Sequence, residues 1–137
     1  MRDTESQLRK FQKELSAGTV SLVLLAVVAF AGPPGRVGAL LVAGHRDDGV
    51  LELAGQVGTG FSAVMRRHLF EVLHPLECRV PSVVNPPVDD LGWRWVEPRH
   101  VGEVAFREWT PGRGLRHASW KGLREVDVLA TRLPPVI

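Results

Sequence analysis

The chain has 137 residues and a formal net charge of +2, with 45% hydrophobic and 23% charged residues, which is the composition of an ordinary globular protein. This length suits one domain with its own core, and the 14 glycines and 10 prolines argue against a helical bundle and for a β-rich fold with many turns. The single cysteine, Cys78, excludes an internal disulfide, and no Cys/His pair has zinc-ligand spacing. We therefore expect a free thiol in a reducing cytoplasm and no metal site.

The first 18 residues predict a short amphipathic helix, from about Glu5 to Ala17. Residues 4–7 (Thr-Glu-Ser-Gln) have the form of a capping box, and Leu8, Phe11 and Leu15 follow at helical spacing. Gly18 is a suitable stop.

Residues 20–31 are an apolar run that has two interpretations. Preceding basic residues and the ending Ala29-Phe30-Ala31 outline a secretory signal peptide, but acidic residues interrupt the basic region. The run is also short for a bilayer, which takes roughly 20 apolar residues. A run rich in Val and Leu is equally typical of a fully buried strand. We favour the strand, because cleavage after Ala31 would delete an element that the fold needs, and we expect the mature protein to keep its N-terminus.

The rest of the chain predicts further strands and one helix. A helix begins at Ser62, where apolar residues follow one face, and ends at Pro75, before a proline-rich connection over residues 78–92. Turns are expected at residues 32–35, 47–49 and 111–114. Strands are predicted at residues 20–31, 37–45, 50–57, 95–109 and 115–123. Five strands with a helix between the third and fourth is the order of an oligonucleotide-binding (OB) barrel, predicted here over residues 19–128 with a tail at 129–137.

Four blocks of sequence resemble the C-terminal OB domain of bacterial ATP-dependent DNA ligases, the ligases of end-joining repair. The blocks are residues 38–42 with 47–49, 57–61, 95–98 with 103–109, and 115–124. Together they cover most of the chain, in the family's order and spacing. The resemblance implies an all-β OB barrel with helices and a domain that binds nicked or broken duplex DNA in repair and recombination.

The turn Gly58-Thr59-Gly60 permits two readings. Glycines let a backbone approach a phosphate closely, and amides at a helix N-terminus favour an anion. The other reading is a turn that needs positive φ angles and joins a strand to a helix.

A basic segment follows near the C-terminus, with seven Lys/Arg against three Glu between residues 93 and 124. This excess suits a polyanion, although a solvated face has the same composition. With the resemblance, it leads us to expect a DNA-binding set: Gly58, Thr59, Gly60, Arg107, Arg113, Arg116, Lys121 and Arg124. The four tryptophans offer stacking platforms for bases, but we expect most of them in the core.

Two motifs of the family that take part in nucleotide chemistry are not matched in this sequence. The family's terminal motif ends Arg-x-Asp-Lys; Arg124 and Glu125 match it, but Val126 and Asp127 do not. No lysine precedes x-Asp-Gly, the site of lysyl-adenylate formation, and the near match at 46–49 begins with an arginine, a poor nucleophile.

We therefore expect no catalytic residue in this chain and no cofactor bound by it alone, with ATP and Mg²⁺ implied for a complete ligase. The partner expected is duplex DNA with nicks or ends. One alternative is an OB subunit that serves a separate nucleotidyltransferase domain in trans, and the other is a protein-binding module or ligase gene fragment without a DNA role.

Overall fold

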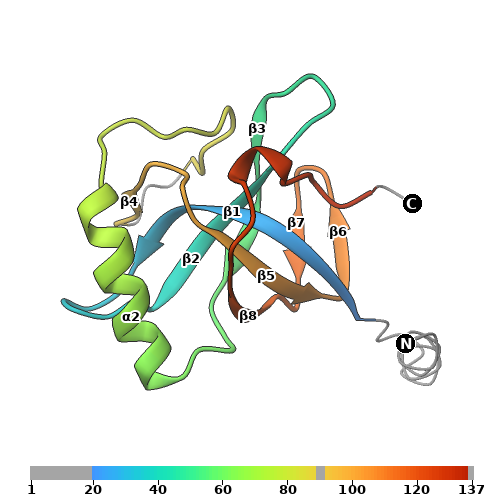
Figure 1. Cartoon of the computed structure of the whole chain (residues 1–137). Coiled ribbons are helices and arrows are strands. Elements are labelled where there is room, and N and C mark those ends of the chain that lie inside the picture. The colour runs from blue at the N-terminus through green and yellow to red at the C-terminus, as the bar shows by residue number, and fades with distance from the viewer. Residues whose placement is uncertain (1–19, 89–91, 136–137) are drawn as a thin grey trace.

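The computed structural model describes residues 20–88 and 92–135, which are mostly β-sheet with one α-helix (Figure 1). The helix predicted over residues 1–18 lies outside the described residues. The strands are β1 Ser21–Ala31, β2 Ala39–His45, β3 Leu51–Val57, β4 Arg94–Trp95, β5 Val101–Phe106, β6 Glu108–Thr110, β7 Gly114–Arg116 and β8 Ser119–Arg124. The helices are α2 Ala63–Leu73 and the short 3₁₀ turns η2 His74–Leu76 and η3 Val128–Ala130.

The strand β1 is the centre of the fold. Its residues Leu25 to Phe30 are all buried, and β1 pairs antiparallel with both β2 and β5. Both faces of its second half are covered, since Leu25, Val27 and Phe30 lie in one core cluster and Ala26, Val28 and Ala29 in another, which explains the uninterrupted apolar run in the sequence. An irregularity between Val27 and Ala29 shifts the register with β2 and bends the strand. The strand predicted at residues 20–31 is confirmed, but it is fully buried only from Leu25 to Phe30, since Leu22 and Leu24 are exposed.

The main sheet has the order β3-β2-β1-β5-β8, and β4 also pairs with β1. Strands β6 and β7 form a separate antiparallel hairpin. Within residues 20–88 and 92–135 no ladder joins β3 to β8, so hydrogen bonds leave the sheet open. The fold is mostly β with one α-helix between β3 and β4, as expected. The main sheet is not closed into a barrel, and the expected number of five strands is not confirmed.

Two predicted strands are wrong in their bounds because the backbone breaks inside each of them. Residues 95–109 are divided by a turn in which Arg99 N donates to Glu97 O at 2.9 Å, and again at Arg107. Residues 115–123 are divided at His117, whose φ of 57° lies in the left-handed region and is incompatible with a strand. The structure therefore has three strands, β4, β5 and β6, where one was predicted at residues 95–109. It has two strands, β7 and β8, where one was predicted at residues 115–123.

The helix α2 closes one side of the core, opposite the β6–β7 hairpin (Figure 1). Ser62 caps it by accepting a hydrogen bond from Met65 N at 3.1 Å. Its buried residues Leu69 and Leu73 join the core cluster that contains Phe30, which also meets Phe70 edge to face at 5.9 Å. In the part of the chain described, no helix is long and apolar enough to cross a membrane.

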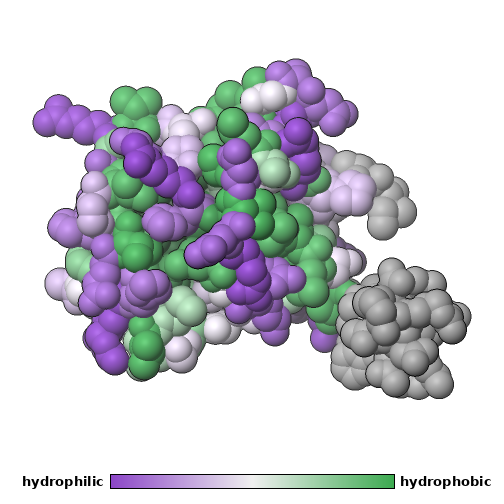
Figure 2. Space-filling view, in the orientation of Figure 1, coloured by the Kyte–Doolittle hydropathy of each residue, from purple (hydrophilic) through white to green (hydrophobic). Residues whose placement is uncertain are grey.

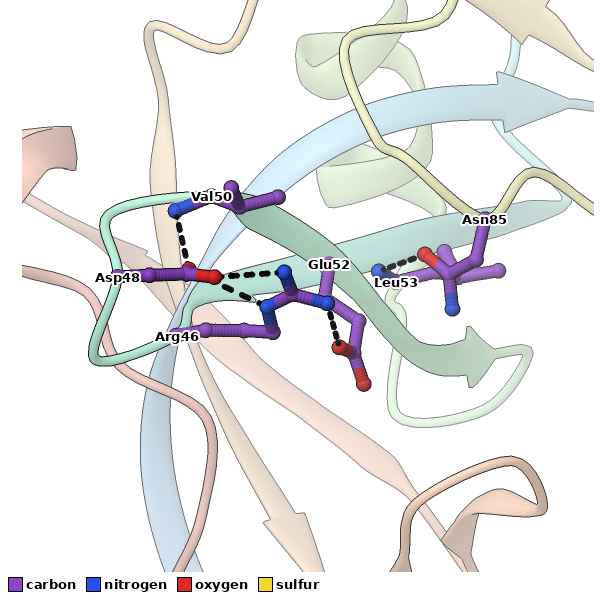
Figure 3. A network of polar contacts seen from close by, with 6 residues as sticks. All are labelled: Arg46, Asp48, Val50, Glu52, Leu53 and Asn85. Carbon is purple, nitrogen blue, oxygen red and sulfur yellow. Dashed lines mark hydrogen bonds and ion pairs between the residues drawn. The ribbon is translucent and has the colours of Figure 1, made fainter.

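The hairpin between β2 and β3 is held by an exposed polar network (Figure 3). Arg46 contacts Asp48 at 2.7 Å and Glu52 at 3.4 Å, and Asp48 Oδ1 accepts from Val50 N at 3.0 Å. The side-chain hydrogen bond from Arg46 lowers the pKa of Asp48, so the pair is ionised at neutral pH. The expected turn at residues 47–49 is confirmed, and the near match to the lysine motif is a structural turn.

Candidate nucleic-acid interface

The glycine turn at residues 58–60 is fastened to the start of β8. Thr59 Oγ1 donates to the carbonyl oxygen of Ala118 at 3.1 Å, and Trp120 N donates to Thr59 O at 2.9 Å. These bonds bring together two segments that lie about sixty residues apart in the chain. The glycine turn and the basic segment therefore share one edge of the molecule.

The two glycines of this turn are not equivalent. Gly60 has a φ of +93°, and a Cβ atom there would lie 2.5 Å from Trp120 O. Gly58 has no other atom within 4 Å of such a Cβ, and its φ is not in the left-handed region. The turn-forming reading therefore accounts for Gly60, whereas Gly58 leaves exposed backbone beside the basic segment.

The Gly60→Ala variant is expected to lower the free energy of unfolding by about 1–3 kcal/mol, because strain at a left-handed residue and the clash with β8 add. Gly58→Ala, two residues away, should change it by about 0.5 kcal/mol or less. Urea unfolding of both variants checks this. Equal stabilities would show that the turn is not held against β8.

The β6–β7 hairpin places charged residues beside this turn. Glu108 and Arg116 are cross-strand partners, with Arg116 Nη1 at 3.6 Å from Glu108 Oε1. Arg107 N donates to Arg116 O at 2.9 Å, which brings the two arginines together. Together with His117 these three residues line a hollow of about 120 Å³. We call turn 58–60, Arg107, Arg116, His117 and Lys121 the basic edge.

The structure places the remaining predicted cations differently. Arg124 lies at the far end of β8 and donates to Glu103 Oε1 at 2.7 and 3.1 Å through Nη2 and Nε. Arg113 lies in the turn of the β6–β7 hairpin, where its N donates to Thr110 O at 3.1 Å. Among the described residues, neither Arg113 nor Lys121 forms an ion pair, and both are exposed. Arg124 is thus engaged within the sheet, while Lys121 is available to an anion.

The departure at the family's terminal motif has a structural explanation. Asp127 occupies the position where the motif has lysine, and its Oδ1 accepts a hydrogen bond from Leu129 N at 2.9 Å. This caps the 3₁₀ turn η3. A lysine at this position has no acceptor atom and cannot make that cap. Asp127 therefore stabilises the local chain.

Trp120 belongs to the core. Its side chain is 2% exposed and stacks on Phe61, with ring centroids 5.8 Å apart. The ring lies against Gly102, where any Cβ would overlap its carbon atoms. Trp95 is also buried, whereas Trp93 and Trp109 are partly buried. The expectation that most tryptophans serve the core holds for Trp95 and Trp120.

Sequence reasoning did not single out Glu103, Glu108 or His117. The two glutamates matter because they face Arg124 and Arg116 across paired strands, which requires the strand register to be known. His117 matters because it ends β7 in the left-handed region, which no local signal such as glycine announces. The opposite charges of Glu108 and Arg116, on either side of the Pro111-Gly112 turn, are the one signal that would have pointed to cross-strand pairing.

The hydropathy of the surface does not by itself mark a site. Figure 2 shows hydrophilic residues interspersed with hydrophobic ones over the face in view. The basic edge is therefore defined by the contacts and charges above.

Comparisons with known proteins identify the family of this chain. Residues 34–127 match the family model of the ATP dependent DNA ligase C terminal region. The chain is 43% identical over 99 residues to the multifunctional non-homologous end joining DNA repair protein LigD of Mycobacterium tuberculosis, and 36% identical over 106 residues to the multifunctional non-homologous end joining protein LigD of Pseudomonas aeruginosa. These alignments cover 69% and 72% of this chain but 13% of each relative.

Solved structures extend the match to the fold. The ligase domain of LigD from M. tuberculosis superposes with a TM-score of 0.72 at 32% identity, covering 82% of this chain and 38% of that one. A mycobacterial DNA ligase D complexed with ATP and MES gives 0.70 at 34% identity, covering 83% and 38%. The similarity thus extends over sequence and structure alike, and the chain belongs to the family of ATP-dependent DNA ligase C-terminal regions.

Proposed function

We propose that this chain is an OB-type domain that binds the phosphates of nicked or broken duplex DNA through the basic edge, as part of ATP-dependent end joining. The observation that carries the proposal is the joining of turn 58–60 to the start of β8 in a chain of this family. The joint places the exposed turn beside β8, which carries Lys121, and the hairpin that carries Arg116 leads directly into β8. The relatives' names refer to non-homologous end joining, which makes broken DNA the polyanion to test first.

The approach of β7 to β3 supports the OB assignment, although no ladder between β3 and β8 closes the sheet. A Cβ at Gly55 of β3 would lie 2.8 Å from Leu115 N of β7, and one at Gly114 would lie 3.0 Å from Ala54 O. The β6–β7 hairpin therefore packs closely against β3. We infer a barrel completed by packing at this seam.

The binding chemistry proposed is electrostatic. Guanidinium groups pair with phosphate oxygens in a forked geometry, and lysine adds a point charge. Neither contact reads a base, so affinity should depend on salt and little on sequence. ATP and Mg²⁺ would be held by the nucleotidyltransferase part of a complete ligase.

Arg116→Ala and Lys121→Ala are each expected to weaken binding of a nicked duplex and to reduce the log–log salt slope by roughly one unit. Arg67→Ala is the matched control, because Arg67 is an exposed arginine on α2 that is not part of the basic edge. Fluorescence anisotropy over a range of salt concentrations measures affinity and slope together. If all three variants bind like the wild type, the basic edge is not the DNA site and a protein-binding role becomes the better account.

A further inference from the structure

The hollow at the base of the β6–β7 hairpin is built for a small anion. Its lining is Arg107, Glu108, Arg116 and His117, and its volume of about 120 Å³ is that of a few water molecules, each taking roughly 30 Å³. Three of the four lining side chains can donate hydrogen bonds, and two of them carry a permanent positive charge. Within the part of the chain that the structure describes, Glu108 is the one acidic group that lines the hollow.

The ion pair inside this hollow is weak enough to be exchanged. Arg116 and Glu108 are separated by 3.6 Å, and their side chains are 56% and 67% exposed. Exposed pairs with a single long contact contribute little in water. The Arg124–Glu103 pair is different, since Glu103 Oε1 accepts two bonds at 2.7 and 3.1 Å and its side chain is only 25% exposed.

We propose that this hollow binds one DNA phosphate and that Glu108 is its internal competitor, holding Arg116 in the free chain and releasing it when a phosphate enters. The inference rests on the proposed function and adds how its site is regulated. A phosphate offers oxygens to both arginines at once, whereas Glu108 reaches only Arg116 among the described residues. The bound group is either a phosphodiester within a strand or the 5′-phosphate at a nick.

The Glu108→Gln variant is expected to bind a nicked duplex about three- to fivefold more tightly, because the phosphate no longer has to displace Glu108 from Arg116 and an ion pair about 4 Å apart is worth about that much in water. Glu125→Gln is the matched control, because it removes the same charge from an exposed residue beyond β8 and should change affinity less than twofold. Arg116→Gln should weaken binding about tenfold, as expected for loss of a charge-assisted hydrogen bond. In the Arg116→Gln background, the gain from Glu108→Gln should shrink.

The assay uses the full 137-residue chain with three labelled duplexes: nicked with a 5′-phosphate, nicked with a 5′-hydroxyl, and intact. If Arg116→Gln weakens binding to all three duplexes, the bound group is a phosphodiester within a strand. If it weakens binding only to the duplex nicked with a 5′-phosphate, the bound group is that terminal phosphate. Circular dichroism confirms that each variant is folded, as expected for exposed side chains.

The outcomes separate this inference from the proposed function. If the wild type binds none of the duplexes at low salt, the proposed function fails. If the wild type binds but Glu108→Gln behaves like Glu125→Gln, DNA binding stands and the phosphate hollow is overturned. If Glu108→Gln raises the affinity for DNA by the same factor in the wild-type and Arg116→Gln backgrounds, Glu108 does not act through Arg116, and the proposed exchange of partners is overturned.

Discussion

Trp120→Ala is expected to lower the free energy of unfolding by about 3–5 kcal/mol, the range for removing a large buried aromatic side chain. The ring is 2% exposed, fills the space above Gly102 and stacks on Phe61. Neighbouring backbone cannot collapse into the gap, because β5 and β8 are held at this point by the pairing of Val104 with Trp120. Urea unfolding followed by circular dichroism measures the loss.

Leu129→Ala serves as the control for this prediction. Leu129 is 68% exposed, so its truncation should change stability by about 0.5 kcal/mol or less. A loss below about 1 kcal/mol for Trp120→Ala would contradict the assignment of Trp120 to the core. Because the Trp120 ring also stacks on Phe61, which follows turn 58–60, its variant would weaken DNA binding indirectly and is unsuitable for mapping the basic edge.

Arg66→Ala is expected to cost about 2–3 kcal/mol of stability, because a charged donor is removed from two part-buried carbonyls. Arg66 Nη1 donates to Val37 O at 2.8 Å and to Gly38 O at 2.9 Å, and the guanidinium lies 4.8 Å from the centre of the Phe61 ring. Arg66 therefore ties α2 to the loop before β2. Thermal and urea unfolding measure the effect.

The neighbouring residue provides the comparison. Arg67 is exposed, and its replacement by alanine should change stability by about 0.5 kcal/mol or less. If Arg66→Ala and Arg67→Ala are equally stable, the two carbonyl contacts do not hold the helix. The structural role of Arg66 also explains why Arg67 is the better control for DNA binding.

The elements that local pattern defines could be predicted from the sequence. The apolar run at residues 20–31 marks β1 because both of its sides are covered. The turn at 47–49 and the helix that starts after Ser62 follow from turn residues and a cap. In each case the signal lies within a few consecutive residues, which is the range that propensity and periodicity report.

The divisions of the later strands could not be predicted in the same way. Val101 to Phe106 and Glu108 to Thr110 are separated by one residue in the sequence and carry apolar residues on both sides of it, but Arg107 turns its backbone toward Arg116. His117 breaks the last stretch without a glycine. These breaks are set by packing of the hairpin against β3, which is a tertiary effect.

The candidate site was predictable in composition but not in pairing. The sequence shows that Arg116, Lys121 and Arg124 are close to one another along the chain. Only the strand register shows that Arg124 is held by Glu103, 21 residues away, while Arg116 has a single weak contact. Which cations remain available to an anion therefore depends on long-range partners.

The central claim is that the basic edge binds DNA phosphates, and the most direct test is the affinity of the wild-type chain for a nicked duplex between about 50 and 200 mM salt. With Arg107, Arg116 and Lys121 each contacting a phosphate, the logarithm of the association constant should fall linearly with the logarithm of salt concentration, with a slope of roughly −3. Absence of binding at the lowest salt, or an affinity that does not change with salt, would contradict the account.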